Sequence, residues 1–222
     1  MLKKLAGVVL IWVGLTMSAW AQTNLQPKYG GVEKNAAQKA ADVEFLAGVD
    51  KYFNNDRTKA AKESSKRGWD FLRKGNVDDA MRRFNQAWLL NPKEGSALWG
   101  MAVVQMVKQQ IEQGMRLFEE AAETQSEDID FAVDHARAMG AAAAAANSQD
   151  LLEKAWIRFE QNYQKAPTHT LNLQNWAISY YYVGMYPEAW QKVLLAEKTP
   201  SAAVLDQRFI HDLAEKMPRP QP

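Results

Sequence analysis

The feature that most constrains this sequence is a pattern of small and aromatic residues that returns about every 34 residues. Its first copy reads Gly68-x2-Phe71, then Ala80-x3-Phe84, then Pro92. The pattern returns three more times, at Ala102 with Gly114 and Phe118, at Ala136 with Ala155 and Phe159, and at Ala177 with Ala189 and Val193. A period of this length indicates a chain built from repeated supersecondary units.

Within each unit, the spacing predicts two antiparallel helices. Large residues follow the small ones at intervals of three and four, which places them on one helical face. The small residues lie where two helices would cross, because a longer side chain would push the helices apart. Gly75 and Gly184 mark turns between helices, and Asn91-Pro92 and Ala166-Pro167 end the second helices of their units.

These residues and their spacing resemble the tetratricopeptide repeat family. The resemblance implies an all-α fold, a right-handed solenoid of about four helix hairpins, because a single hairpin cannot bury its apolar face alone. The expected units span residues 61–94, 95–128, 129–169 and 170–203. The third is the least regular, and it can also be read as a degenerate helical hairpin.

An alanine-rich stretch interrupts the phase of the third unit by about seven residues. Gly140 is followed by Ala141 to Ala146, and alanine is the best helix former, so we expect the first helix of this unit to run about two turns too long. Asp150 with Glu153 predicts a capping box for the next helix. The long helix presents either a smooth solvated surface or a close-packing surface for a partner backbone.

Residues 1–21 have the pattern of a secretory signal peptide. Lys3 and Lys4 precede an apolar run from Leu5 to Leu15, and Ala19-Trp20-Ala21 forms a small-x-small cleavage site. Cleavage after Ala21 would place the mature protein in a periplasm or outside the cell, without stable membrane insertion. An uncleaved membrane anchor is the alternative. The sequence contains no cysteine, which excludes a lipoprotein anchor, disulfides and thiol catalysis.

The folded domain is expected to span residues 36–217. Residues 22–35 are polar, contain Gly30-Gly31, and predict a flexible lead. A helix over residues 36–53 should cover the apolar end of the first unit, and a C-terminal cap over residues 202–217 should cover the last one, because terminal repeats need caps. The proline-rich tail 218–222 is expected to be disordered.

The sequence gives little sign of a chemical centre. It contains 27 basic and 26 acidic residues without a basic stripe, which argues against nucleic acid as a partner. His135, His169 and His211 lack a metal-binding spacing, and neither a glycine-rich phosphate loop nor a Gly-x-Ser-x-Gly motif is present. We therefore expect no cofactor, no metal and no enzymatic activity.

The resemblance implies that the first helix of each unit lines a concave groove, which the sequence makes largely apolar. The groove residues predicted to bind a partner are Ser65, Trp69, Leu72, Trp99, Val103, Met106, Val133, Arg137, Gln174, Ile178 and Tyr181. The family also includes members that grip a carboxylate, but the lysine and asparagine pattern of that clamp is missing here. The predicted function is an exported scaffold or adaptor of the cell envelope that binds a protein or peptide.

Three other interpretations stay open. The groove could serve a small enzyme or a ligand-binding protein, which would require Asp130, Arg137, Gln174 and a histidine to converge. It could instead mediate self-association into a homo-oligomer. In the third interpretation, a terminal helix of the chain itself fills the groove and buries Trp69 and Trp99.

Overall fold

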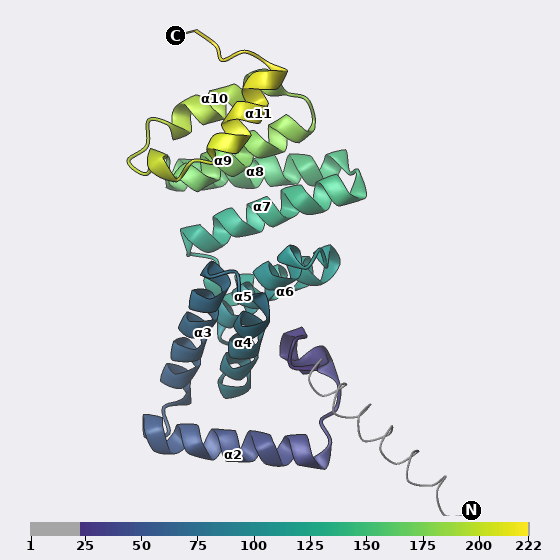
Figure 1. Ribbon diagram of the computed structural model, residues 1–222, viewed down its shortest axis with the longest axis vertical. Coiled ribbons are helices and arrows are strands. Elements are labelled where there is room, and N and C mark those ends of the chain that lie inside the picture. The colour runs from purple at the N-terminus through teal and green to yellow at the C-terminus, as the bar shows by residue number, and fades with distance from the viewer. Residues whose placement is uncertain (1–22, 222) are drawn as a thin grey trace, which may run out of the picture. The chain divides into compact units, whose positions relative to one another are not determined.

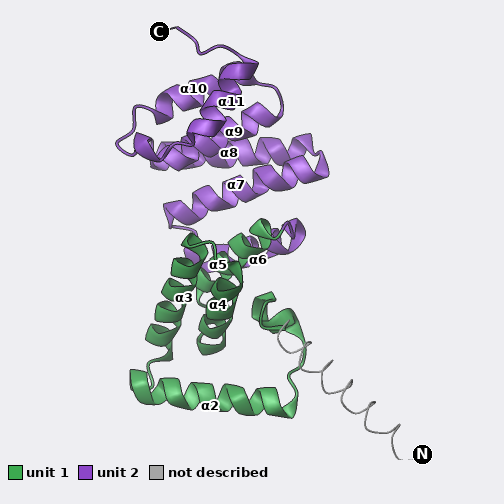
Figure 2. Cartoon of the chain, in the orientation of Figure 1, with its two compact units in different colours: residues 1–108 green, residues 109–222 purple. Residues whose placement is uncertain are grey.

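The computed structural model describes residues 23–221, and all of its regular elements in that range are helices (Figure 1). The predicted all-α class is confirmed. The signal-peptide segment 1–21 lies outside the described residues. The chain divides into two compact units, residues 1–108 and 109–222 (Figure 2), and the boundary falls at the turn within the second predicted repeat. Each unit is described by itself below.

Within residues 23–108, unit 1 contains the 3-10 turn η1 (Pro27–Gly31) and the helices α2 (Ala36–Phe53), α3 (Arg57–Arg73), α4 (Val77–Leu90) and α5 (Gly95–Val107). Helices α3 and α4 form the first hairpin, and α5 packs against both of them. Asp56 caps α3 by accepting a hydrogen bond from the backbone N–H of Lys59 at 2.9 Å. The predicted turn at Gly75 is present, with a φ of +75° that glycine adopts without steric cost.

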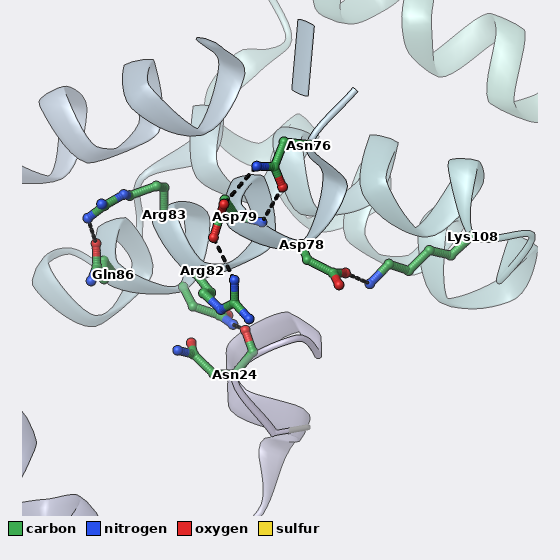
Figure 3. A network of polar contacts seen from close by, with 9 residues as sticks. Asn24, Asn76, Asp78, Asp79, Arg82, Arg83, Gln86 and Lys108 are labelled. Carbon is green, nitrogen blue, oxygen red and sulfur yellow. Dashed lines mark hydrogen bonds and ion pairs between the residues drawn. The ribbon is translucent and has the colours of Figure 1, made fainter. Parts of the chain in front are cut away.

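Polar side chains fix the start of α4 (Figure 3). The side chain of Asn76 accepts from the backbone N–H of Asp79 at 3.3 Å, and its amide donates to the Asp79 carboxylate at 2.7 Å. Arg82 donates to the same carboxylate, and these two hydrogen bonds hold the Asp79 pKa below its usual range. Lys108 at the end of α5 donates to Asp78 at 2.9 Å, which ties the end of α5 to the start of α4.

Helix α2 covers the apolar end of the first hairpin, as predicted, but it does so loosely. Phe45, Leu46, Val49 and Phe53 pack against a small cluster made of Ala60, Ala61 and Leu90. None of the α2 residues is fully buried. The helix therefore contributes one apolar stripe and leaves the rest of its surface in solvent.

The prediction of a flexible lead over residues 22–35 is wrong for its central part. The turn η1 packs against α4. Asn85, which is fully buried in α4, donates from its amide to the backbone oxygens of Asn24 at 3.0 Å and Gln26 at 2.9 Å. Its side-chain oxygen accepts from the backbone N–H of Tyr29 at 3.4 Å. A buried amide needs such partners, and the main chain of the lead supplies them.

Unit 2 contains α6 (Ile111–Gln125), α7 (Ile129–Ala146), α8 (Gln149–Lys165), α9 (Thr170–Tyr182), α10 (Tyr186–Ala196), the turn η2 (Ala202–Val204) and α11 (Gln207–Lys216). The hairpins are α7 with α8 and α9 with α10. Helix α7 has 18 residues and α9 has 13, so the alanine run does lengthen α7. The predicted capping box is wrong, because Ser148 is the N-cap of α8 and Asp150 lies in its first turn.

The C-terminal helix α11 closes unit 2 over residues within the predicted cap. Phe209 and Leu213 join a core cluster with Trp190 and Val193 of α10, and the Trp190 indole donates to the backbone oxygen of Met217 at 2.9 Å. The prediction of a disordered tail fails at Arg219, whose guanidinium forms two hydrogen bonds with Glu197 at 2.7 and 2.8 Å. Among helices of residues 23–221, none combines the length and the apolar character that a membrane span requires.

Candidate functional site

Two tryptophans meet on one surface of unit 1. The rings of Trp69 on α3 and Trp99 on α5 lie 4.7 Å apart, centre to centre, at 62°. The Trp69 indole donates to the hydroxyl of Ser96 at 3.0 Å, and its ring packs edge-on against Phe84 at 5.5 Å. Both tryptophans are half-buried. One face of the pair is therefore held by the fold, while part of each indole stays accessible.

Two glycines allow the helices that carry these tryptophans to approach Phe84. A Cβ atom on Gly68 of α3 would lie 2.5 Å from the Phe84 ring, and one on Gly100 of α5 would lie 2.1 Å from it. The Phe84 ring, which has no exposed surface, fills the space that both glycines leave open. This close packing sets where α3 and α5 place Trp69 and Trp99.

Around the tryptophan pair lies an open cavity of about 510 Å³. We call this surface the tryptophan face and define it by the residues that line the cavity: Lys62, Ser65, Lys66, Trp69, Arg73, Glu94, Ser96 and Trp99. Three predicted groove residues, Ser65, Trp69 and Trp99, belong to it. The other three from unit 1 do not line the cavity: Val103 is buried, and Leu72 and Met106 are half-buried.

The tryptophan face is more charged than the prediction of an apolar groove implies. Lys66 and Arg73 follow Lys62 and Trp69 by one helical turn each, and both line the cavity. The sequence analysis missed them, although the i, i+4 spacing was there to find them. Glu94 is largely buried at the same site, and this burial raises its pKa against the opposing effect of nearby Lys62.

In unit 2, helices α7, α8 and α9 surround a second cavity, of about 610 Å³. Three predicted groove residues, Arg137, Gln174 and Ile178, line it, together with Ala141 and Ala144 from the alanine run of α7. Val133 does not line this cavity, because its side chain is buried and only 3% of its surface is exposed.

Tyr181 is also absent from the cavity of unit 2. Its ring packs on Phe209 of α11 at 5.7 Å and on Tyr186 of α10 at the same distance. The C-terminal helix thus takes Tyr181 into the core cluster that it covers.

Three polar side chains of the second cavity, those of Arg137, Gln174 and Ser179, are engaged by the fold. Arg137 pairs with Asp134 at 3.1 Å, and the Gln174 side-chain oxygen accepts from the backbone N–H of Asp206 at 2.7 Å. The Ser179 hydroxyl accepts from the Trp156 indole at 3.0 Å and donates to the Trp176 backbone oxygen at 2.6 Å. These groups position helices, and their hydrogen bonds leave them little capacity for a small ligand.

An enzyme in this region would need Asp130, Arg137, Gln174 and a histidine to converge, and these four side chains do not all come together. Asp130 lies 2.9 Å from His169 Nε2, but Arg137 and Gln174 have the other partners named above. His169 caps α9 through Nδ1, which accepts from the backbone N–H of Asn172, so its proton resides on Nε2. No group of three potential metal ligands occurs within residues 23–221.

His135 is a core residue. Its ring stacks on Phe118 at 5.3 Å, and burial, together with the nearby Arg158, lowers its pKa to about 4. It is therefore neutral near pH 7 and holds an aromatic contact between α6 and α7 rather than a chemical role.

No protein-family model matches the sequence, and no curated protein matches it either. Solved structures do. TTC0263 from Thermus thermophilus, described as a thermophilic TPR protein, superposes with a TM-score of 0.60 at 16% identity over 70% of this chain and 80% of its own. This chain has a tetratricopeptide repeat fold.

Two further bacterial structures share this repeat fold. PilF from Pseudomonas aeruginosa superposes with a TM-score of 0.55 at 17% identity, covering 72% of this chain and 70% of its own. MamA from Desulfovibrio magneticus RS-1 gives 0.53 at 13% identity, covering 73% and 84%. At these identities the likeness concerns the fold alone. Tetratricopeptide repeats generally present surfaces for other proteins.

Proposed function

We propose that this protein is an interaction scaffold that holds a protein or peptide partner on the tryptophan face of unit 1. The observation that carries the proposal is the pair Trp69 and Trp99, whose rings are in contact and half-exposed beside an open cavity. Tryptophans dominate the binding energy of protein interfaces, and a fold of stacked helix hairpins supplies the extended surface on which such anchors act.

The competing interpretation of a groove filled by a terminal helix is not favoured for unit 1. Helix α2 packs on Ala60, Ala61 and Leu90, none of which lines the tryptophan face. The segment around η1 packs on α4 through Asn85, which is also outside it. Neither of these two described segments covers the tryptophan face, which supports its use by a partner.

Substitution of the tryptophans tests the proposal. Trp69→Ala and Trp99→Ala should each weaken binding of a partner captured from envelope extract by about 2–4 kcal/mol, because each removes a large anchor. Trp88→Ala is the matched control, since Trp88 is half-buried in the same unit but does not line the cavity. Urea unfolding of all three variants separates lost binding from lost folding. Equal affinity of the Trp88 and Trp99 variants would contradict the proposal.

We further propose that the scaffold acts in the periplasm or outside the cell, as the sequence pattern of residues 1–21 indicates. Mass spectrometry of the protein from its native host should find a chain that begins at Gln22. A chain that retains Met1 in a membrane fraction would support the uncleaved anchor instead.

A further inference from the structure

The tryptophan face carries a row of cations along one side of α3. Lys62, Lys66, Trp69 and Arg73 recur at intervals of four, three and four residues, so they share one helical face. All four line the same cavity, and the three basic side chains are exposed. The indole of Trp69 thus lies within a basic stripe.

The carboxylates near this stripe leave it with a surplus of positive charge. Arg73 forms an ion pair with Asp70, which does not line the cavity. The charge of Lys62 favours the ionised form of the largely buried Glu94. Lys66 has neither a hydrogen bond nor an ion pair with any residue of the described range 23–221. Three cations against one carboxylate line the cavity, so an approaching anion meets a net attraction.

A buried hydroxyl at the same place lacks a partner. Ser65 of α3 lines the cavity with 2% of its surface exposed, and its Oγ makes no hydrogen bond among the described residues. A serine hydroxyl can donate one hydrogen bond and accept others, and a buried one normally has at least one partner. A partner oxygen that reaches the Ser65 hydroxyl would supply the hydrogen bond that it lacks.

We propose that the tryptophan face binds an acidic peptide segment, one in which aspartate or glutamate side chains flank a large apolar residue. The apolar residue packs on Trp69 and Trp99, and the carboxylates lie along Lys62, Lys66 and Arg73. The Ser65 hydroxyl donates to an oxygen of the segment. This inference rests on the proposed function, and it specifies the chemistry of the partner.

Nucleic acid is the less favoured anion. Backbone phosphates bind through many cations in a continuous groove, whereas this face offers three. Two of these cations are in addition shared with Asp70 and Glu94. A short acidic segment matches the small number of cations and the single aromatic pair.

Synthetic peptides with blocked ends test the inference by calorimetry on the full chain. At low salt, we expect the acidic peptide Ac-EDEFEDE-NH2 to bind at least about 10-fold more tightly than the neutral peptide Ac-QNQFQNQ-NH2. The basic peptide Ac-KRKFKRK-NH2 should not bind. The preference for the acidic over the neutral peptide should shrink at high salt. Lys66→Glu should weaken binding of the acidic peptide by about 10-fold or more. Lys51→Glu is the matched control, an exposed lysine on α2 outside the cavity.

The possible failures are distinguishable. Equal binding of the acidic and neutral peptides, unchanged by Lys66→Glu, would overturn the inference and leave apolar docking on the tryptophans intact. Absence of binding by all three peptides would overturn it as well, while the tryptophan variants still test the scaffold independently. Tight binding of the neutral peptide only when its C-terminus is free would assign the cations to a chain terminus. If an oligothymidylate bound as tightly as the acidic peptide, the three cations would be assigned to the binding of phosphate groups. Either result would also overturn the inference.

Discussion

At the scale of single residues, the close approach of the Phe84 ring to Gly68 and Gly100 determines which substitutions unit 1 tolerates at these two positions. Gly100→Ala should lower the free energy of unfolding by about 1–3 kcal/mol, because its new methyl would overlap a ring that has no exposed surface and cannot move aside. Urea unfolding measures this. Gly48→Ala in α2 is the control: a Cβ added there would meet no packed neighbour within 4 Å, so the change should be neutral or stabilising by up to about 1 kcal/mol.

A compensating change sharpens this prediction. Phe84→Leu shortens the side chain that the new methyl would meet, so the double variant should be less destabilised than the sum of the two single variants. Strict additivity would mean that the glycine acts through helix propensity alone. The repeat pattern placed Gly68 at a helix crossing and did not include Gly100. Their real neighbour is one ring held between α3 and α5.

At the scale of elements, the N-terminal segment shows what periodicity cannot reveal. The hairpins were predictable because their pattern is local, with small and large residues three and four positions apart. The docking of η1 depends on Asn85, which is distant in sequence from the segment it binds and has no place in a repeat pattern. Lys28 and Tyr29 also adopt left-handed backbone angles, with φ of 52° and 57°, which are costly for residues other than glycine.

Removing the amide of Asn85 should therefore release this segment. Asn85→Ala loses three hydrogen bonds to the main chain of residues 24–29 and should reduce stability by about 1–3 kcal/mol. Without that anchor, the left-handed turn has less to hold it, and trypsin should cleave after Lys28 faster than in the wild type. Gln86→Ala is the control, since Gln86 pairs with Arg83 on the outside of α4 (Figure 3). Unchanged cleavage at Lys28 would show that other contacts fix the turn.

At the scale of the whole molecule, the candidate site was predictable in part. The repeat register placed Trp69 and Trp99 among the groove positions on the first helices of adjacent repeats, and their rings are in contact. It missed Lys66 and Arg73 because they fall outside the inner positions that the family resemblance supplies. It misplaced Tyr181, because the register of α9 does not reveal that α11 will cover it. The packing of a terminal helix thus accounts for Tyr181, whereas the register taken from the family accounts for Lys66 and Arg73.

The same terminal elements predict an uneven distribution of stability along the chain. Helix α2 has no buried residue, and its Val43 and Tyr52 are 67% and 82% exposed, whereas α11 buries Leu213 completely and is fixed by the Trp190 indole at Met217. Local opening is easiest where few apolar contacts must break. Hydrogen–deuterium exchange should therefore label peptides from residues 36–53 faster than those from residues 207–216, with α4 as the protected reference.

A dilution series of this exchange experiment also tests self-association. If α2 is covered only by its own unit, its exchange should not change with protein concentration, because the opening is intramolecular. Protection that rises with concentration would instead indicate that a second copy covers the exposed stripe of α2, since binding to the folded form alone stabilises it by mass action. Equal protection of α2 and α11 at every concentration would contradict the loose packing on which this prediction rests.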